Sequence, residues 1–109
     1  MVTNEFIEKA IEIMDEAKGR MDWQRFNSCN AYLGDTVYVT DDKGVTHHLV
    51  PIKSYRTIVG FVDTTDGIAY EYGKYSRTTS KQFSQICNQR FRNLNPKREL
   101  VDVSTAGRW

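Results

Sequence analysis

Cysteine is scarce in this sequence. The 109 residues contain two cysteines, Cys29 and Cys87, and neither belongs to a Cys-x-x-Cys pair. A domain held together by disulfides would carry more cysteines at this length. With His47 and His48 the two cysteines reach the number needed for a Cys2His2 set, but their spacing matches no zinc module. We therefore predict two buried thiols, no metal site and no cofactor.

Long apolar runs are absent as well. No segment approaches the roughly 20 apolar residues of a membrane-spanning helix. The start of the chain, Met1 to Phe6, lacks the basic and then apolar pattern of a signal peptide. These absences predict a cytoplasmic protein with no membrane partner.

The signatures of common enzyme classes are also missing. The sequence contains no glycine-rich dinucleotide loop, no Walker loop, no Gly-x-Ser-x-Gly and no His-Glu-x-x-His. His47 and His48 are neighbours in a predicted strand, so their side chains should point to opposite faces and cannot chelate one ion together. Neither cysteine has an activating neighbour in the sequence. We predict that the protein is not an enzyme.

The sequence does contain enough apolar material for one core. Hydrophobic residues make up 39% of the chain and charged residues 27%, as is usual in a globular domain. A chain of this length fits a single domain, residues 1–109. Residues 97–109 are predicted to be a partly ordered tail, with one short strand at 100–103.

Two amphipathic helices are predicted from apolar residues at three- and four-residue spacing. The first covers residues 4–18, with Thr3 as its cap and Gly19 as its stop signal. The second covers residues 80–92 and begins with a capping box formed by Thr79 and Gln82.

Alternating apolar residues predict two β-hairpins between these helices. One joins 36–40 to 45–50, and the other joins 55–62 to 68–72, while Pro51 should break the chain between them. Residues 20–34 are predicted to be irregular. The expected fold is therefore α+β, a four-stranded antiparallel sheet flanked by an N-terminal and a C-terminal helix. Both helices could pack on one face and leave the other face in water.

Charge is distributed unevenly along the chain. Residues 1–42 contain nine acidic and four basic residues, a balance of −5, and residues 43–109 contain eleven basic and five acidic residues, a balance of +6. The stretch from Tyr72 to Arg98 contains seven basic residues and no acidic one. Such asymmetry indicates that one end of the protein has an anionic partner.

The predicted contact surface lies around the start of the second helix. Backbone N–H groups at a helix start, together with cations, can hold a phosphate, and tyrosines can stack on bases. The alternative is local structure: Thr79 caps the helix, the tyrosines line the sheet and the cations keep the surface hydrated. The residues predicted to contact a macromolecule are Lys74, Arg77, Lys81, Arg90, Arg92, Tyr72 and Tyr75.

Two short motifs in this region carry a resemblance. They are Ser54-Tyr55-Arg56-Thr57-Ile58-Val59 and Tyr75-Ser76-Arg77-Thr78-Thr79-Ser80. From Ser54 to Phe91, about a third of the chain, the sequence resembles a group of small proteins of unknown function encoded by bacteriophages and mobile elements. Phage proteins of this size include the anti-CRISPR inhibitors.

The resemblance implies a stoichiometric inhibitor that needs no cofactor. Its partner would be a host defence protein, such as a Cas9-type nuclease or its guide complex. The alternative is a nucleic-acid-binding phage accessory protein that uses the basic helix start. The oligomeric state is not predicted.

Overall fold

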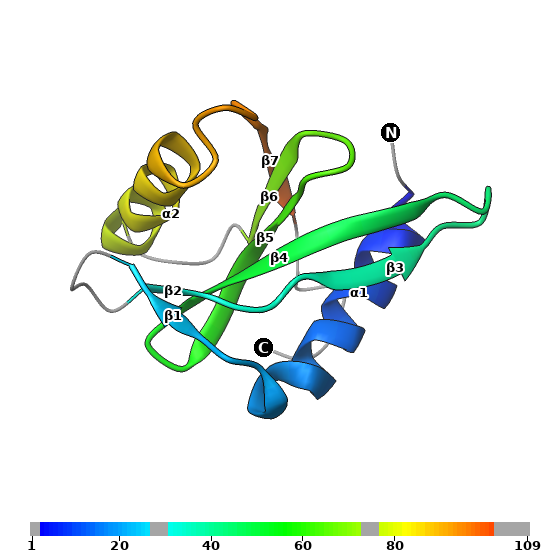
Figure 1. Ribbon diagram of the computed structural model, residues 1–109, viewed down its shortest axis with the longest axis horizontal. Helices are drawn as coiled ribbons and strands as arrows, with labels where there is room; N and C mark the ends of the chain where they lie inside the picture. The colour runs from blue at the N-terminus through cyan, green and yellow to red at the C-terminus, as the bar shows by residue number, and fades with distance from the viewer. Residues whose placement is uncertain (1–2, 27–30, 73–76, 102–109) are drawn as a thin grey trace.

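The computed structural model describes residues 3–26, 31–72 and 77–101. Its elements follow one another in a helix–sheet–helix–strand order (Figure 1). They are α1 (Asn4–Ala17), the 3-10 turn η1 (Lys18–Arg20), β1 (Gln24–Arg25), β2 (Ala31–Leu33), β3 (Val37–Thr40), β4 (Thr46–Ser54), β5 (Thr57–Asp63), β6 (Ile68–Tyr72), α2 (Arg77–Gln89) and β7 (Lys97–Val101).

The described strands form one mixed sheet of seven, in the order β1-β2-β4-β5-β6-β7, with β3 also paired to β4. The fold is α+β, but the prediction of a four-stranded antiparallel sheet was wrong. The segment 20–34 supplies β1 and β2 instead of an irregular loop. β7 begins at Lys97, earlier than predicted, and pairs in parallel with β6 because α2 carries the chain back across the sheet.

Pro51 was predicted to end a strand, but it lies inside β4. β3 pairs with the first part of β4 up to Leu49, and β2 pairs with the last part from Ile52. Pro51 falls between these two partners, where its carbonyl accepts a hydrogen bond from the N–H of Gly34. A proline lacks the N–H for a ladder bond, and this junction is where that loss matters least.

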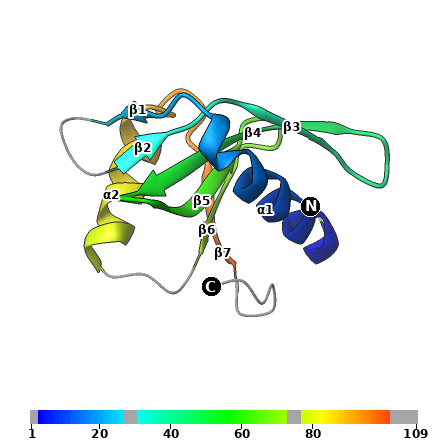
Figure 2. The same ribbon diagram turned by 90° about the horizontal axis from the view of Figure 1, so that it is seen from below.

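The two helices cover opposite faces of the sheet (Figures 1 and 2). On one face Phe6 and Met14 of α1 pack with Leu49 and Phe61 of the sheet. On the other face, Phe83, Ile86 and Cys87 of α2 pack with Val62 and Ile52 of the sheet. The prediction that one face would lie in water was therefore wrong. Because both faces are covered, β5 and β6 are buried along almost their whole length.

The helix ends agree only partly with the predicted signals. Thr3 is the N-cap of α1, and its hydroxyl accepts a hydrogen bond from the N–H of Phe6 at 3.2 Å, as predicted. Gly19 does not terminate the chain's helical course, which continues through η1. α2 begins at Arg77, so Thr79 lies within the helix and is not its cap. Within the described residues, no helix is both long enough and apolar enough to cross a membrane.

Candidate functional site

α2 is fixed to the sheet by a very close contact. Phe83, Ile86 and Cys87 are buried, and Phe83 lies over Gly60 of β5. A Cβ atom at position 60 would come within 2.5 Å of the Phe83 ring and 2.4 Å of the Tyr70 carbonyl oxygen. Glycine at this position allows the helix to approach the sheet backbone, which sets the position of the outer helix face.

That outer face carries part of the predicted contact surface. Lys81 is exposed on α2, and Arg92 is exposed in the turn that follows the helix. Arg90 is exposed too, but its guanidinium donates to the Oε1 of Gln24 at 3.3 Å and so points towards β1. Arg77 is the first residue of α2.

The other predicted contact residues are Tyr72, Lys74 and Tyr75. Tyr72 is 1% exposed and belongs to the core on the α1 side of the sheet, so its side chain cannot support an external contact in this structure. Lys74 and Tyr75 lie outside the described residues.

The buried carboxylate of Glu71 neutralises one of the cations in the acid-free stretch. It accepts hydrogen bonds from the Ser80 hydroxyl at 2.7 Å and from the Arg98 guanidinium. Arg98 also donates to the Ser84 hydroxyl at 2.6 Å and lies over the ring of Phe83. This network connects β6, α2 and β7, which indicates that Arg98 has a structural role.

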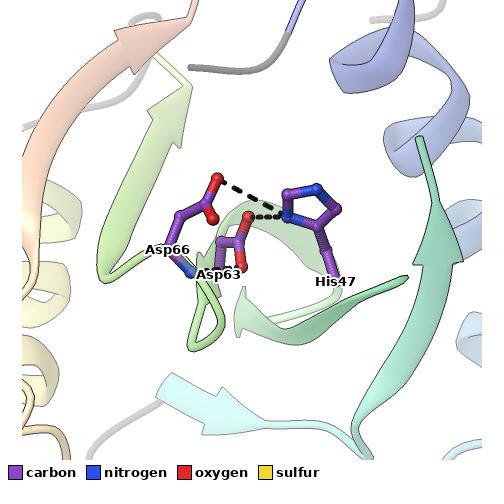
Figure 3. A group of neighbouring side chains, drawn as sticks. All are labelled: His47, Asp63 and Asp66. Carbon is purple, nitrogen blue, oxygen red and sulfur yellow. Dashed lines mark hydrogen bonds and ion pairs between the residues drawn. The ribbon is translucent and has the colours of Figure 1, made fainter. Parts of the chain in front are cut away.

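A second group of charged side chains surrounds His47 on the α1 face (Figure 3). His47 is 2% exposed. Its Nε2 is 2.8 Å from Oδ2 of Asp41, and its Nδ1 is 2.7 Å from Oδ2 of Asp63. Oδ2 of Asp66 lies 3.6 Å from the same Nδ1. We refer to His47, Asp41, Asp63 and Asp66 as the His47 cluster.

Two hairpin turns place these aspartates. Oδ1 of Asp41 accepts from the backbone N–H groups of Lys43 and Val45, which closes the β3–β4 turn. Oδ1 of Asp63 accepts in the same way from Thr65 and Asp66 in the β5–β6 turn. Asp41 and Asp63 therefore each use one oxygen to close a turn and the other to hold His47.

Both ring nitrogens of His47 face carboxylates, which accept hydrogen bonds, so this arrangement favours the doubly protonated ring. Burial alone would lower the pKa of His47, but the hydrogen bonds that the ring donates to Asp41 and Asp63, together with the charges of Asp63 and Asp66, outweigh it and raise the pKa. The hydrogen bond to His47, with help from the Val45 N–H, lowers the pKa of Asp41. A doubly protonated ring has no lone pair for general-base catalysis.

The surroundings of the cluster are apolar on one side and open on another. The ring of Phe6 lies 4.7 Å from the imidazole, measured between centroids. A pocket of about 200 Å³, lined by Phe6, Lys9 and Thr40 among others, opens beside Asp41. The side chain of Asp66 is 30% exposed, so the β5–β6 turn gives solvent access to the cluster.

Sequence reasoning found only part of this cluster. The opposite orientation of His47 and His48 is confirmed, since His47 is buried and His48 is exposed. The convergence of Asp41, Asp63 and Asp66 was missed because these residues come from two separate turns. The available signal was an aspartate at the start of each predicted hairpin turn, next to an inward-facing histidine.

Cys87 is buried, as predicted, and burial raises the pKa of its thiol to about 11. A thiol with this pKa is a poor nucleophile at neutral pH. Cys29 lies outside the described residues.

No protein-family model, no curated protein and no solved structure matches this chain. Its function is therefore inferred from the arrangement of its own side chains.

Proposed function

We propose that this protein is a non-catalytic binding protein that attaches to an acidic macromolecule through the α2 side of the molecule. The observation that carries this proposal is the acid-free stretch of sequence between Glu71 and Glu99, which contains the anchored helix α2. Lys81 and Arg92 are exposed there, while Phe83 of the same helix is buried. A rigid cationic surface of this kind favours an anionic partner.

The chemistry of the described histidine and thiol groups supports binding over catalysis. His47 is held between two carboxylates, and the raised pKa of Cys87 disfavours its thiolate. On the family resemblance, the proposed partner is a host defence protein in the bacterial cytoplasm, such as a Cas9-type nuclease with its guide RNA. The protein would act by stoichiometric occupancy of an acidic surface on that partner.

A cleavage assay tests this proposal directly. Purified Cas9-type nuclease loaded with guide RNA is mixed with increasing amounts of the protein before target DNA is added. A stoichiometric inhibitor blocks cleavage at about one protein per nuclease, whereas an enzyme that inactivated the nuclease would act at far lower ratios. Full cleavage at a large excess of the protein would contradict the proposed partner.

A pair of charge-reversal variants tests the surface. Lys81→Glu/Arg92→Glu should weaken binding roughly 10- to 100-fold, because both reversals place negative charge against an acidic partner. Lys43→Glu/Arg20→Glu makes the same change of net charge at exposed positions away from α2 and should bind like the wild type. Equal affinity of both variants would remove α2 as the contact surface.

Nucleic acid is the competing partner, and the same variants distinguish it. Binding to bare duplex or single-stranded DNA, with a steep loss of affinity as salt rises, would point to the phosphate backbone. If the protein still binds the Cas9-type nuclease after all nucleic acid has been digested, the partner is protein.

A further inference from the structure

The His47 cluster has the donor set of a metal site. Nδ1 of His47, Oδ2 of Asp63 and Oδ2 of Asp66 all lie within 4.8 Å of one another. Ligands bonded to one ion at about 2.0–2.2 Å are separated by roughly 3–4 Å. The 3.6 Å from Nδ1 to Asp66 lies within that range, and the 2.7 Å from Nδ1 to Asp63 lies just below it. Small side-chain rotations would centre the three atoms on an ion.

Asp41, the fourth member of the cluster, lies where a carboxylate would support a metal-binding histidine without binding the ion itself. Asp41 accepts a hydrogen bond from Nε2, the ring nitrogen that faces away from Asp63. Histidine ligands of metal ions commonly donate their second N–H to a carboxylate, which fixes the ring and makes the ligating nitrogen more basic. Asp41 would therefore be a positioning residue, and Nδ1 the ligating atom.

A second feature lies on the same face of the sheet. The hydroxyl of Tyr70 is buried and has no hydrogen-bond partner among the described residues, although the residue is only 3% exposed. Tyr70 lies on the α1 face of β6, two residues from Ile68, whose Cα pairs with that of Asp63. Burial, followed by the charges of Asp63, Asp66 and Glu99, raises its pKa to about 12.

A buried hydroxyl without a partner calls for a water or an ion. Tyr70 shares a sheet face with Asp63, and the charges of Asp63 and Asp66 both act on its hydroxyl. We propose that His47, Asp63 and Asp66 bind a divalent first-row transition-metal ion, with Tyr70 as a hydrogen-bonding group for a water on that ion.

The donor set selects the class of ion. An imidazole nitrogen with carboxylate oxygens suits Zn²⁺ or Mn²⁺ better than Mg²⁺ or Ca²⁺, which prefer oxygen ligands throughout. The ion takes the place of the proton on Nδ1 and enters past Asp66, the most exposed of the three ligands. It would connect β4 to the β5–β6 turn, which is a structural role and separate from the α2 surface of the proposed function.

The test uses the full chain, freed of metal by EDTA, and measures binding of ZnCl2 by calorimetry at pH 7.5. The exposed His48 is the main competitor for zinc, so His48→Gln serves as the reference protein. It should bind one Zn²⁺ per chain. Asp66→Asn in the same background should weaken binding at least 10-fold, whereas Asp42→Asn, an equal charge change at an exposed residue outside the cluster, should leave it unchanged.

The use of Mn²⁺ in place of Zn²⁺ provides a second measurement, which needs no variant of a ligand residue. In the wild-type protein, substoichiometric MnCl2 should broaden the NMR signals of the His47 ring more than those of the His48 ring, and MgCl2 should not displace it at equal concentration. Loss of zinc binding in His48→Gln, unchanged binding in Asp66→Asn, or Mn²⁺ broadening confined to His48 would each overturn the proposal.

Discussion

Arg98 of β7 and Glu71 of β6 form a salt bridge beside the ring of Phe83. The two residues belong to neighbouring parallel strands, and Ser80 and Ser84 of α2 bind the same pair. A cation from the acid-free stretch is thus used to fasten the last described strand to the rest of the fold.

Substitution of Arg98 by methionine is expected to destabilise the protein by about 1.5–3 kcal/mol. The Glu71 carboxylate would stay buried and, among the described residues, keep the hydrogen bond from Ser80 but lose that from Arg98, which leaves a charged group less satisfied. Urea unfolding followed by circular dichroism measures the change. Lys97→Met is the matched control, because the Lys97 side chain is 72% exposed and its loss should change stability by less than about 0.5 kcal/mol.

Gly60→Ala should be among the most damaging small substitutions in the chain. The added methyl group would meet the Tyr70 carbonyl oxygen at 2.4 Å, and a backbone atom in a sheet cannot move aside as a side chain can. We expect a loss of about 1–3 kcal/mol or more in the free energy of unfolding. Gly19→Ala, where nothing lies within 4 Å, should be neutral or stabilising by up to about 1 kcal/mol; equal effects at both positions would contradict the contact.

His47→Gln should destabilise the metal-free protein by about 3–5 kcal/mol. The change removes the cation between Asp41 and Asp63 and leaves the fully buried Asp63 carboxylate without this charged partner. Unfolding is measured in the presence of EDTA, with His48→Gln as the control that should stay within about 0.5 kcal/mol of the wild type. A loss below roughly 1 kcal/mol at His47 would mean that the cluster contributes little to stability.

The Cys87 thiol should make the protein less stable to unfolding at alkaline pH. Its pKa is raised from 9.0 to about 11 because burial disfavours the thiolate in the folded state. The corresponding stability is fully present below pH 9 and is lost as pH rises from 9 through 11, since the unfolded chain then ionises first. In a Cys29→Ser background, unfolding free energy should fall more steeply over this window than in Cys29→Ser/Cys87→Ala.

Thiol reactivity checks the same group at lower pH. At pH 8 the folded Cys29→Ser protein should react with a disulfide reagent roughly 100-fold more slowly than the urea-unfolded chain, because the thiolate fraction differs by the same factor. Equal rates would show that Cys87 is accessible and ionises normally.

The sequence predicted the parts of the fold that local chemistry controls. Turn residues and alternation located the two hairpins, β3–β4 and β5–β6, and periodicity located α1 and most of α2. Two-residue β1 and three-residue β2 carry too little pattern to be recognised. β2 forms because β4 is long enough to pair with it, and β1 pairs with β2 in turn. The run Ile58 to Val62 is almost continuously apolar, which in retrospect is the signal of a strand covered on both faces.

The candidate sites show the same division. Strand alternation was sufficient to separate His47 from His48. It could not place Asp63 beside His47, because that depends on the register in which Leu49 pairs with Asp63 across β4 and β5. Tyr72 was predicted at the surface, but the position of α1 over β6 buries it.

The parallel pairing of β6 with β7 also bears on how the protein matures on the ribosome. β7 is the last described strand, so β6 has an open edge until residues 97–101 have left the exit tunnel. An open, apolar edge is a template for unwanted pairing with other nascent chains. The crossover through α2 delays closure of that edge until β7 has emerged, and ribosome-stalled chains that stop before Lys97 should aggregate unless a chaperone covers them.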